Sequence, residues 1–125
     1  MRNFDKARYL LHKKARRRSR TYPLGTIAYY GRDDQRATKV VVGILDRQNN
    51  IIAMKKWFSD DEDVRQSPAI AQQIVDFLEQ EHAERVVMPE RIIGCPHEEG
   101  IDYPDGESCP HCPFWKGRDR SAALR

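Results

Sequence analysis

The sequence predicts an α+β fold in which one helix packs on a small, mainly antiparallel sheet. Three short runs between residues 24 and 58 are rich in β-branched and aromatic residues, as strands are. A helix-start signal and an amphipathic repeat follow, and then a further apolar piece. The 125 residues are 39% hydrophobic, enough for one modest core. We therefore expect one packed unit, residues 23–93, between an arm at 1–22 and a C-terminal segment at 94–125.

The N-terminal arm, residues 1–22, is strongly basic. Residues 1–20 hold nine of the 22 Lys and Arg and a single acid, Asp5. Asn3 can cap a helix with a thin apolar face made of Phe4, Ala7, Leu11 and Ala15. Repulsion among the arginines after residue 15, followed by Pro23, should end that helix. A mildly acidic body with a basic arm is typical of proteins that contact polyanions.

The three apolar runs are predicted to be strands at Leu24–Tyr30, Lys39–Leu45 and Ile51–Phe58. The segments between them, residues 31–35 and 46–50, carry turn-forming residues, so we expect consecutive pairing as a three-stranded antiparallel meander. The second run has no polar face from Val40 to Leu45. This pattern predicts that the second strand lies at the centre of the sheet.

A helix is predicted to begin at Ser67-Pro68, where serine can cap and proline occupies the first helical position. Its apolar stripe consists of Ile70, Ile74, Phe77 and Leu78, and it should end near residues 82–84. The acidic run before it, residues 60–63, is most simply a solvated loop, with a cation site as the alternative. Beyond the helix, Val86–Met88 and Ile92–Ile93 are β-like pieces separated by Pro89.

Three strands, a helix and a strand, in that order, resemble the beginning of ribonuclease-H-like folds. The resemblance implies a metal-dependent nuclease, whose first strand carries a carboxylate that binds metal. Residues 24–31 contain no Asp or Glu. We therefore discount nuclease chemistry for this chain.

Two cysteine clusters form the most specific pattern in the chain. Cys95-Pro96-His97 and Cys109-Pro110-His111-Cys112 offer thiolate and imidazole ligands of the kind that structural Zn²⁺ takes. The second cluster resembles a zinc knuckle, and residues 93–116 together resemble a zinc-ribbon segment. Turn-forming residues in the eleven positions between His97 and Cys109 allow the clusters to meet. The preferred ligands are Cys95, His97, Cys109 and Cys112.

The sequence leaves the identity of the fourth ligand open, because Glu98 occupies the position of a second cysteine in the first cluster. Imidazole is a better ligand than carboxylate for zinc among three thiolates, which favours His97, and Glu98 is the alternative. His111 is expected to point outward, and His82 at the helix end is a further candidate. Two interpretations involve no metal: a redox-active cysteine pair, or cysteines that remain as unliganded thiols.

An enzymatic alternative rests on the resemblance of His97-Glu98-Glu99 and Cys109-x-x-Cys112 to zinc-dependent nucleobase and nucleoside deaminases. The resemblance implies Glu99 as the proton shuttle. Deaminase clusters sit at two helix starts joined through a strand, and eleven residues are too few for that connection. Ser108 replaces the usual proline, and Cys95 would have no role. The chain is therefore interpreted as a non-enzymatic protein with no catalytic residues assigned.

Composition also bears on location. Three cysteines cannot all pair within one chain, so a reducing compartment, the cytoplasm, is expected. No apolar run approaches the roughly 20 residues of a membrane span, and no membrane partner is expected.

The predicted function is a small zinc-binding protein that associates with DNA or RNA through its arm and the residues after the metal cluster. Phe114 and Trp115 most simply pack on the metal turn, and the alternative is that they stack on bases. The candidate nucleic-acid contacts are Lys13, Lys14, Arg16, Arg17, Arg18, Arg20, Trp115 and Lys116. The alternative function is a protein-interaction module, whose arm docks on an acidic partner and whose sheet edge or Trp57-Phe58 forms the contact.

Overall fold

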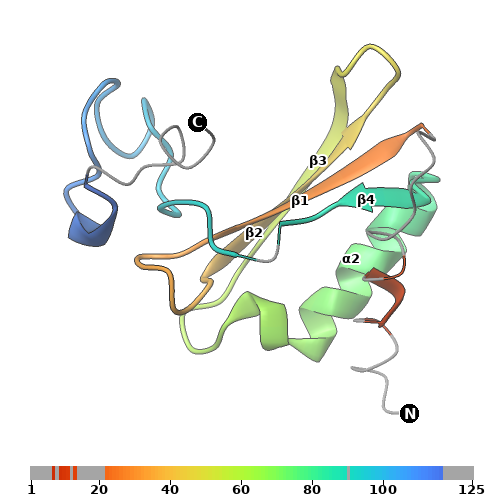
Figure 1. Cartoon of the computed structure of the whole chain (residues 1–125), viewed down its shortest axis with the longest axis horizontal. Helices are drawn as coiled ribbons and strands as arrows, with labels where there is room; N and C mark the ends of the chain where they lie inside the picture. The colour runs from red at the N-terminus through yellow and green to blue at the C-terminus, as the bar shows by residue number, and fades with distance from the viewer. Residues whose placement is uncertain (1–6, 8, 12, 14–21, 90, 117–125) are drawn as a thin grey trace.

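The computed structural model describes residues 7, 9–11, 13, 22–89 and 91–116, which form a four-stranded sheet with one long helix on one face (Figure 1). The mixed α+β class is therefore confirmed. The strands lie in the order β3-β2-β1-β4. Their bounds are β1 at Leu24–Tyr30, β2 at Lys39–Leu45, β3 at Ile51–Phe58 and β4 at Arg85–Val87.

Strand pairing places the apolar β2 inside the sheet. It pairs antiparallel with β1, where Ile27 faces Val42, and antiparallel with β3, where Val40 faces Trp57. Burial of Val40, Val42 and Ile44 follows, because an inner strand has neighbours on both sides. β4 pairs with β1 in parallel, after the crossover through the helix. The register of β2 and β3 shifts between Ile44 and Leu45, and this leaves Ile52 without a cross-strand partner.

The helix α2, Pro68–Gln80, begins as its sequence predicts. The Ser67 side chain accepts a hydrogen bond from the Ile70 N–H at 3.2 Å, and proline takes the first turn. The side chains buried against the sheet are Ala71, Ile74, Val75 and Leu78. Ile70 and Phe77 of the expected stripe are only partly buried, at its margins.

The helix ends at Gln80, before the predicted end at residues 82–84. His82 has a φ of 60°, and its N–H donates to the Glu79 carbonyl at 3.1 Å. The Ala83 N–H donates to the Leu78 carbonyl at 2.8 Å, which completes a Schellman motif. Because His82 occupies the left-handed position of this motif, its place in the fold is explained without a metal.

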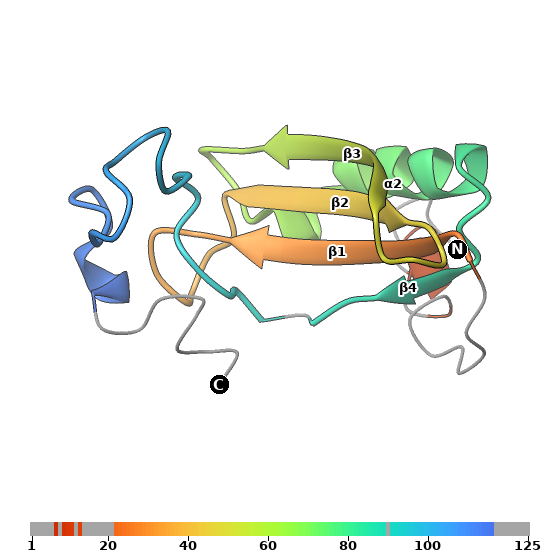
Figure 2. The same ribbon diagram turned by 90° about the horizontal axis from the view of Figure 1, so that it is seen from above.

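The described part of the N-terminal arm is helical and packs on the domain. Ala7 and Leu11 are buried, as the predicted apolar face requires, whereas Lys13 is exposed. This short segment lies on the same side of the sheet as α2 (Figures 1 and 2). The other predicted members of its face, Phe4 and Ala15, lie outside the described residues.

Strand β3 forms one edge of the sheet and carries exposed apolar side chains: Ile51, Ile52, Met54 and Phe58. Trp57 is different. It is buried, and its indole N–H donates to the Gln73 side chain at 2.9 Å. The expected contact surface at Trp57-Phe58 is therefore corrected to Phe58 alone, because neighbouring strand residues point to opposite faces.

Within the described residues no helix is long and apolar enough to cross a membrane.

Replacing Ile74 by alanine should destabilise the domain by about 2–5 kcal/mol, because a fully buried side chain leaves a cavity. The matched control is Ile52→Ala, which removes the same atoms from an exposed position that lacks a cross-strand partner and should cost less than about 1 kcal/mol. Urea unfolding followed by circular dichroism measures both. Equal losses for the two variants would contradict the assigned packing of α2.

Candidate metal centre

Residues 92–94 bring the first cysteine cluster to the end of β1. Ile92 forms a parallel bridge with Tyr29, and the Ile93 N–H donates to the Tyr29 carbonyl at 2.9 Å. The Gly31 N–H then donates to the Gly94 carbonyl at 2.9 Å. The predicted β piece at Ile92–Ile93 is thus a bridge rather than a named strand. Cys95 follows directly, and the segment beyond it sits at one end of the sheet (Figure 2).

Cys95, His97, Cys109 and Cys112 converge into one group that could hold a metal ion. Their ligand atoms all lie within 4.8 Å of one another. The His97 Nδ1 atom is 3.3 Å from the Cys95 sulfur, 3.4 Å from the Cys109 sulfur and 3.5 Å from the Cys112 sulfur. One nitrogen therefore lies almost equally far from three sulfurs. It is the only such group of His, Cys, Asp or Glu in the described part of the chain.

The three cysteines are buried, and the surroundings of Cys95 and Cys112 favour the neutral thiol when no cation is near. Burial raises the pKa of Cys95, and it raises the pKa of Cys112 with a further contribution from the other thiols. A bound cation reverses this preference because it stabilises thiolates. The His97 N–H donates to the Cys95 sulfur at 3.3 Å, so the backbone also supports negative charge there.

The second cluster is fixed to the sheet by the short 3₁₀ helix η2, Pro113–Trp115. Trp115 is buried, and its indole N–H donates to the Gly31 carbonyl at 2.7 Å. Phe114 packs edge-on against it, with ring centroids 5.0 Å apart. This burial makes Trp115 structural, so we remove it from the candidate base contacts. Lys116 is exposed.

Glu98, the alternative ligand, does not join the group. Its carboxylate lies 2.7 Å from the Lys56 Nζ and 3.9 Å from the Lys39 Nζ. The hydrogen bond from Lys56 and the charge of Lys39 lower the pKa of Glu98. Lys39 is itself buried and donates to the carbonyl of Pro96 at 3.0 Å, which lies between two of the candidate ligands. This lysine links the sheet to residues 94–116, which we call the metal segment. The link was not found from the sequence, although a lysine at the first position of an apolar strand is a usable signal.

The other candidate residues are placed as follows. His111 is exposed, with its ring centroid 5.4 Å from that of His97, and it is not part of the group. His82 is also outside it. The arm residues Lys14, Arg16, Arg17, Arg18 and Arg20 lie outside the described residues.

Within the described residues, the acidic run at 60–63 is not part of a group that could hold a metal ion. Asp63 instead caps the 3₁₀ helix η1, Val64–Gln66, and pairs with the Arg65 guanidinium at 2.6 Å. Partial burial opposes ionisation of Asp63, but the hydrogen bonds and charge of Arg65 outweigh it and lower its pKa. The solvated-loop interpretation therefore needs one correction, which is that Asp63 has a structural role.

The deaminase arrangement is not formed. Within residues 94–116 the described backbone contains turns, a bridge between Glu99 and Tyr103, and η2, with no α-helix at either cluster. The Glu99 carboxylate, expected to shuttle protons, accepts the Gly106 N–H at 2.9 Å on the exposed side of the loop. Gly100 and Gly106 have φ of 84° and 82°, which allows the loop to turn back.

Comparisons of this chain with protein families, with curated proteins and with solved structures found no match. The geometry and chemistry of the chain are therefore the basis for assigning its function.

Replacing His97 by alanine should abolish stoichiometric metal binding, because it removes the only nitrogen among the four ligand atoms. His111→Ala is the matched control, since the same atoms are lost from an exposed neighbour outside the group. Glu98→Gln should also keep the metal. Elemental analysis of the purified proteins measures the metal per chain, and metal loss in Glu98→Gln with retention in His97→Ala would reverse the ligand assignment.

Proposed function

We propose that the metal is zinc and that its role is structural. The observation that carries this proposal is the set of three distances from the His97 Nδ1 atom, 3.3, 3.4 and 3.5 Å, to the cysteine sulfurs. A tetrahedral zinc with ordinary bond lengths places nitrogen and sulfur ligands about 3.5 Å apart. Three thiolates and one imidazole also suit zinc in ligand type. Four protein ligands close the site and leave no position for an activated water.

The metal segment has little apolar surface with which to fold. Ile101 is 77% exposed, and Tyr103 and Phe114 are only partly buried. Trp115 is the one large aromatic side chain that this segment buries among the described residues. Zinc would therefore supply much of the free energy that orders residues 94–116, as it does in small zinc modules.

Removal of zinc by a chelator should loosen residues 94–116 and leave the sheet folded. Hydrogen exchange followed by mass spectrometry should show faster exchange in this segment and unchanged protection in β2, because β2 is paired with a strand on each side. Native mass measurement before and after chelation checks that one zinc per chain is lost. A native mass equal to the bare chain before chelation would reject the zinc proposal.

For the whole protein we propose association with DNA or RNA in the cytoplasm, with the basic arm as the main contact. The arm carries nine Lys and Arg in its first 20 residues, and Lys13 and Lys116 are exposed. Such clustered charge binds phosphates through release of counterions. We assign no catalytic residue.

A protein-interaction module is the second candidate, and the exposed apolar side chains on the edge strand β3 favour it. An edge strand offers unpaired backbone groups to a partner, and Ile51, Ile52 and Met54 would add apolar contact. An acidic partner would also attract the arm.

Salt dependence separates the two candidates. Binding of nucleic acid should weaken linearly on a log–log scale, with a slope near −0.9 per neutralised phosphate for duplex. Arg17→Gln/Arg18→Gln should reduce both affinity and slope. The matched control is Arg47→Gln/Lys55→Gln, which removes the same charge from exposed positions elsewhere and should have a smaller effect. If the chain without residues 1–20 binds DNA and RNA as well as the full chain, the proposal for the arm fails.

A further inference from the structure

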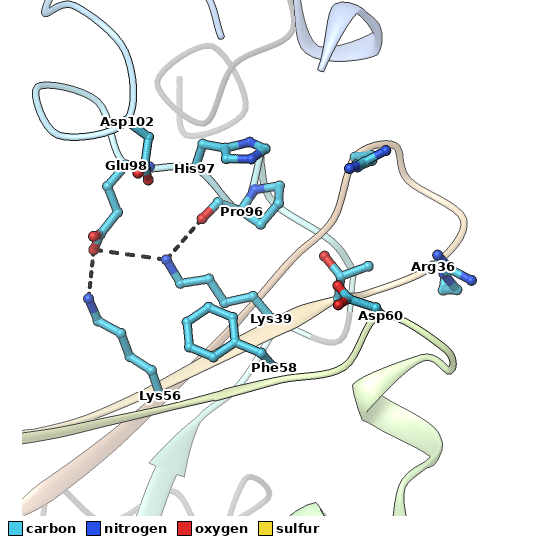
Figure 3. Close-up of a pocket in the computed structure, with 11 residues that line it drawn as sticks. Arg36, Lys39, Lys56, Phe58, Asp60, Pro96, His97, Glu98 and Asp102 are labelled. Atoms are coloured by element: carbon cyan, nitrogen blue, oxygen red, sulfur yellow. Dashed lines mark hydrogen bonds and ion pairs between the residues drawn. The ribbon is translucent and has the colours of Figure 1, made fainter. Parts of the chain in front are cut away.

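A surface pocket of about 650 Å³ lies between the sheet and the metal centre (Figure 3). Arg32 and Arg36 contribute from the loop between β1 and β2, and Lys39, Lys56 and Phe58 from the neighbouring strands. The other wall is the metal segment, from Pro96 to Glu98, with Asp102 beside it. The volume falls in the range of roughly 300–1,000 Å³ that small-ligand sites occupy.

The charges in the pocket leave two arginines available. Four cationic side chains face three carboxylates, which are Asp60, Glu98 and Asp102. Glu98 forms ion pairs with the two lysines, and the Asp102 carboxylate accepts a hydrogen bond from the Glu98 N–H at 2.7 Å. Within the described residues neither Arg32 nor Arg36 forms an ion pair. Their guanidinium groups are suited to bind a phosphate from outside.

An aromatic ring lines the same pocket as these arginines. Phe58 lines the pocket and is 65% exposed, a large apolar area to leave in water. The Lys39 Nζ lies 5.6 Å from the centre of its ring, a cation–π distance that holds charge next to the ring. In Figure 3 the ring stands between Lys39, Lys56 and Asp60, and Arg36 lies on the other side of Asp60.

We propose that this pocket binds a single-stranded nucleic acid, with one base stacked on Phe58 and an adjacent phosphate bound by Arg32 and Arg36. Exposed aromatic rings beside cationic groups are how proteins hold single strands, because unpaired bases offer their faces and duplex bases do not. The inference rests on the proposed association with nucleic acid and adds that the strand is single. It also assigns Phe58 the stacking role that the buried Trp115 cannot fill.

The test compares a labelled oligothymidylate and a labelled oligouridylate with a duplex DNA of equal length, by fluorescence anisotropy at fixed salt on the zinc-loaded full chain. Phe58→Ala should weaken binding of the single strands on the order of tenfold and leave the duplex within about twofold. Phe58→Leu, which keeps the apolar bulk, should show the same loss, whereas Phe58→Trp should retain binding. Ile52→Ala, an exposed apolar position outside the pocket on the same strand, is the matched control.

A second pair of variants tests the phosphate contact. Arg36→Gln should weaken single-strand binding, and Arg47→Gln, an exposed arginine outside the pocket, should have a smaller effect. Circular dichroism and zinc content verify that each variant is folded. If Phe58→Leu binds single strands as well as the parent while Arg17→Gln/Arg18→Gln weakens binding, the pocket inference is overturned and the arm proposal stands. Equal losses on single strand and duplex also overturn it. If the parent chain binds neither, the proposed nucleic-acid function itself fails.

Discussion

The backbone of Gly31 is the junction on which the metal segment depends. Its N–H donates to the Gly94 carbonyl at 2.9 Å, and its carbonyl accepts the Trp115 indole N–H at 2.7 Å. One peptide position at the end of β1 therefore holds the chain on both sides of the cysteine clusters. A Cβ atom at this position would meet the Arg36 carbonyl oxygen at 2.2 Å, so the close approach of the β1–β2 loop requires glycine. These two hydrogen bonds tie the segment that carries the candidate metal ligands to the end of the sheet.

The elements of the fold were predictable where the signal is local. The β-branched runs gave the three antiparallel strands, and Ser67-Pro68 gave the start of α2 through its own side-chain and backbone chemistry. The end of α2 was placed too late, because His82 adopts a left-handed conformation that is common for glycine and uncommon for other residues. Trp57 was assigned to the surface because the register that buries it depends on β2, a partner that sequence pattern alone does not fix.

The candidate site was likewise predictable only where the signal is local in sequence. Cysteine and histidine spacing was enough to propose four ligands, because metal chemistry limits the residue types and the loop lengths. The pocket beside them was not foreseen, since Lys39, Lys56 and Glu98 come from separate segments and meet only after strand pairing. Trp115 looked suitable for stacking from its neighbours in sequence, yet its hydrogen bond to a residue 84 positions away buries it. Contacts of long range in sequence decide which aromatic ring stays exposed.

The positions of these residues along the chain also determine the order in which the structure can form during synthesis. All the described strands and α2 lie between residues 24 and 87, so the sheet can assemble while later residues are still within the ribosome. Gly31 has to wait for its second partner, because the indole that binds its carbonyl belongs to residue 115. Closure of the cysteine group is therefore a late step that follows release of nearly the whole described chain. A metal ion bound by this group would be acquired by a protein whose sheet already exists, and the supply of metal would decide when residues 94–116 become ordered, not whether the sheet forms.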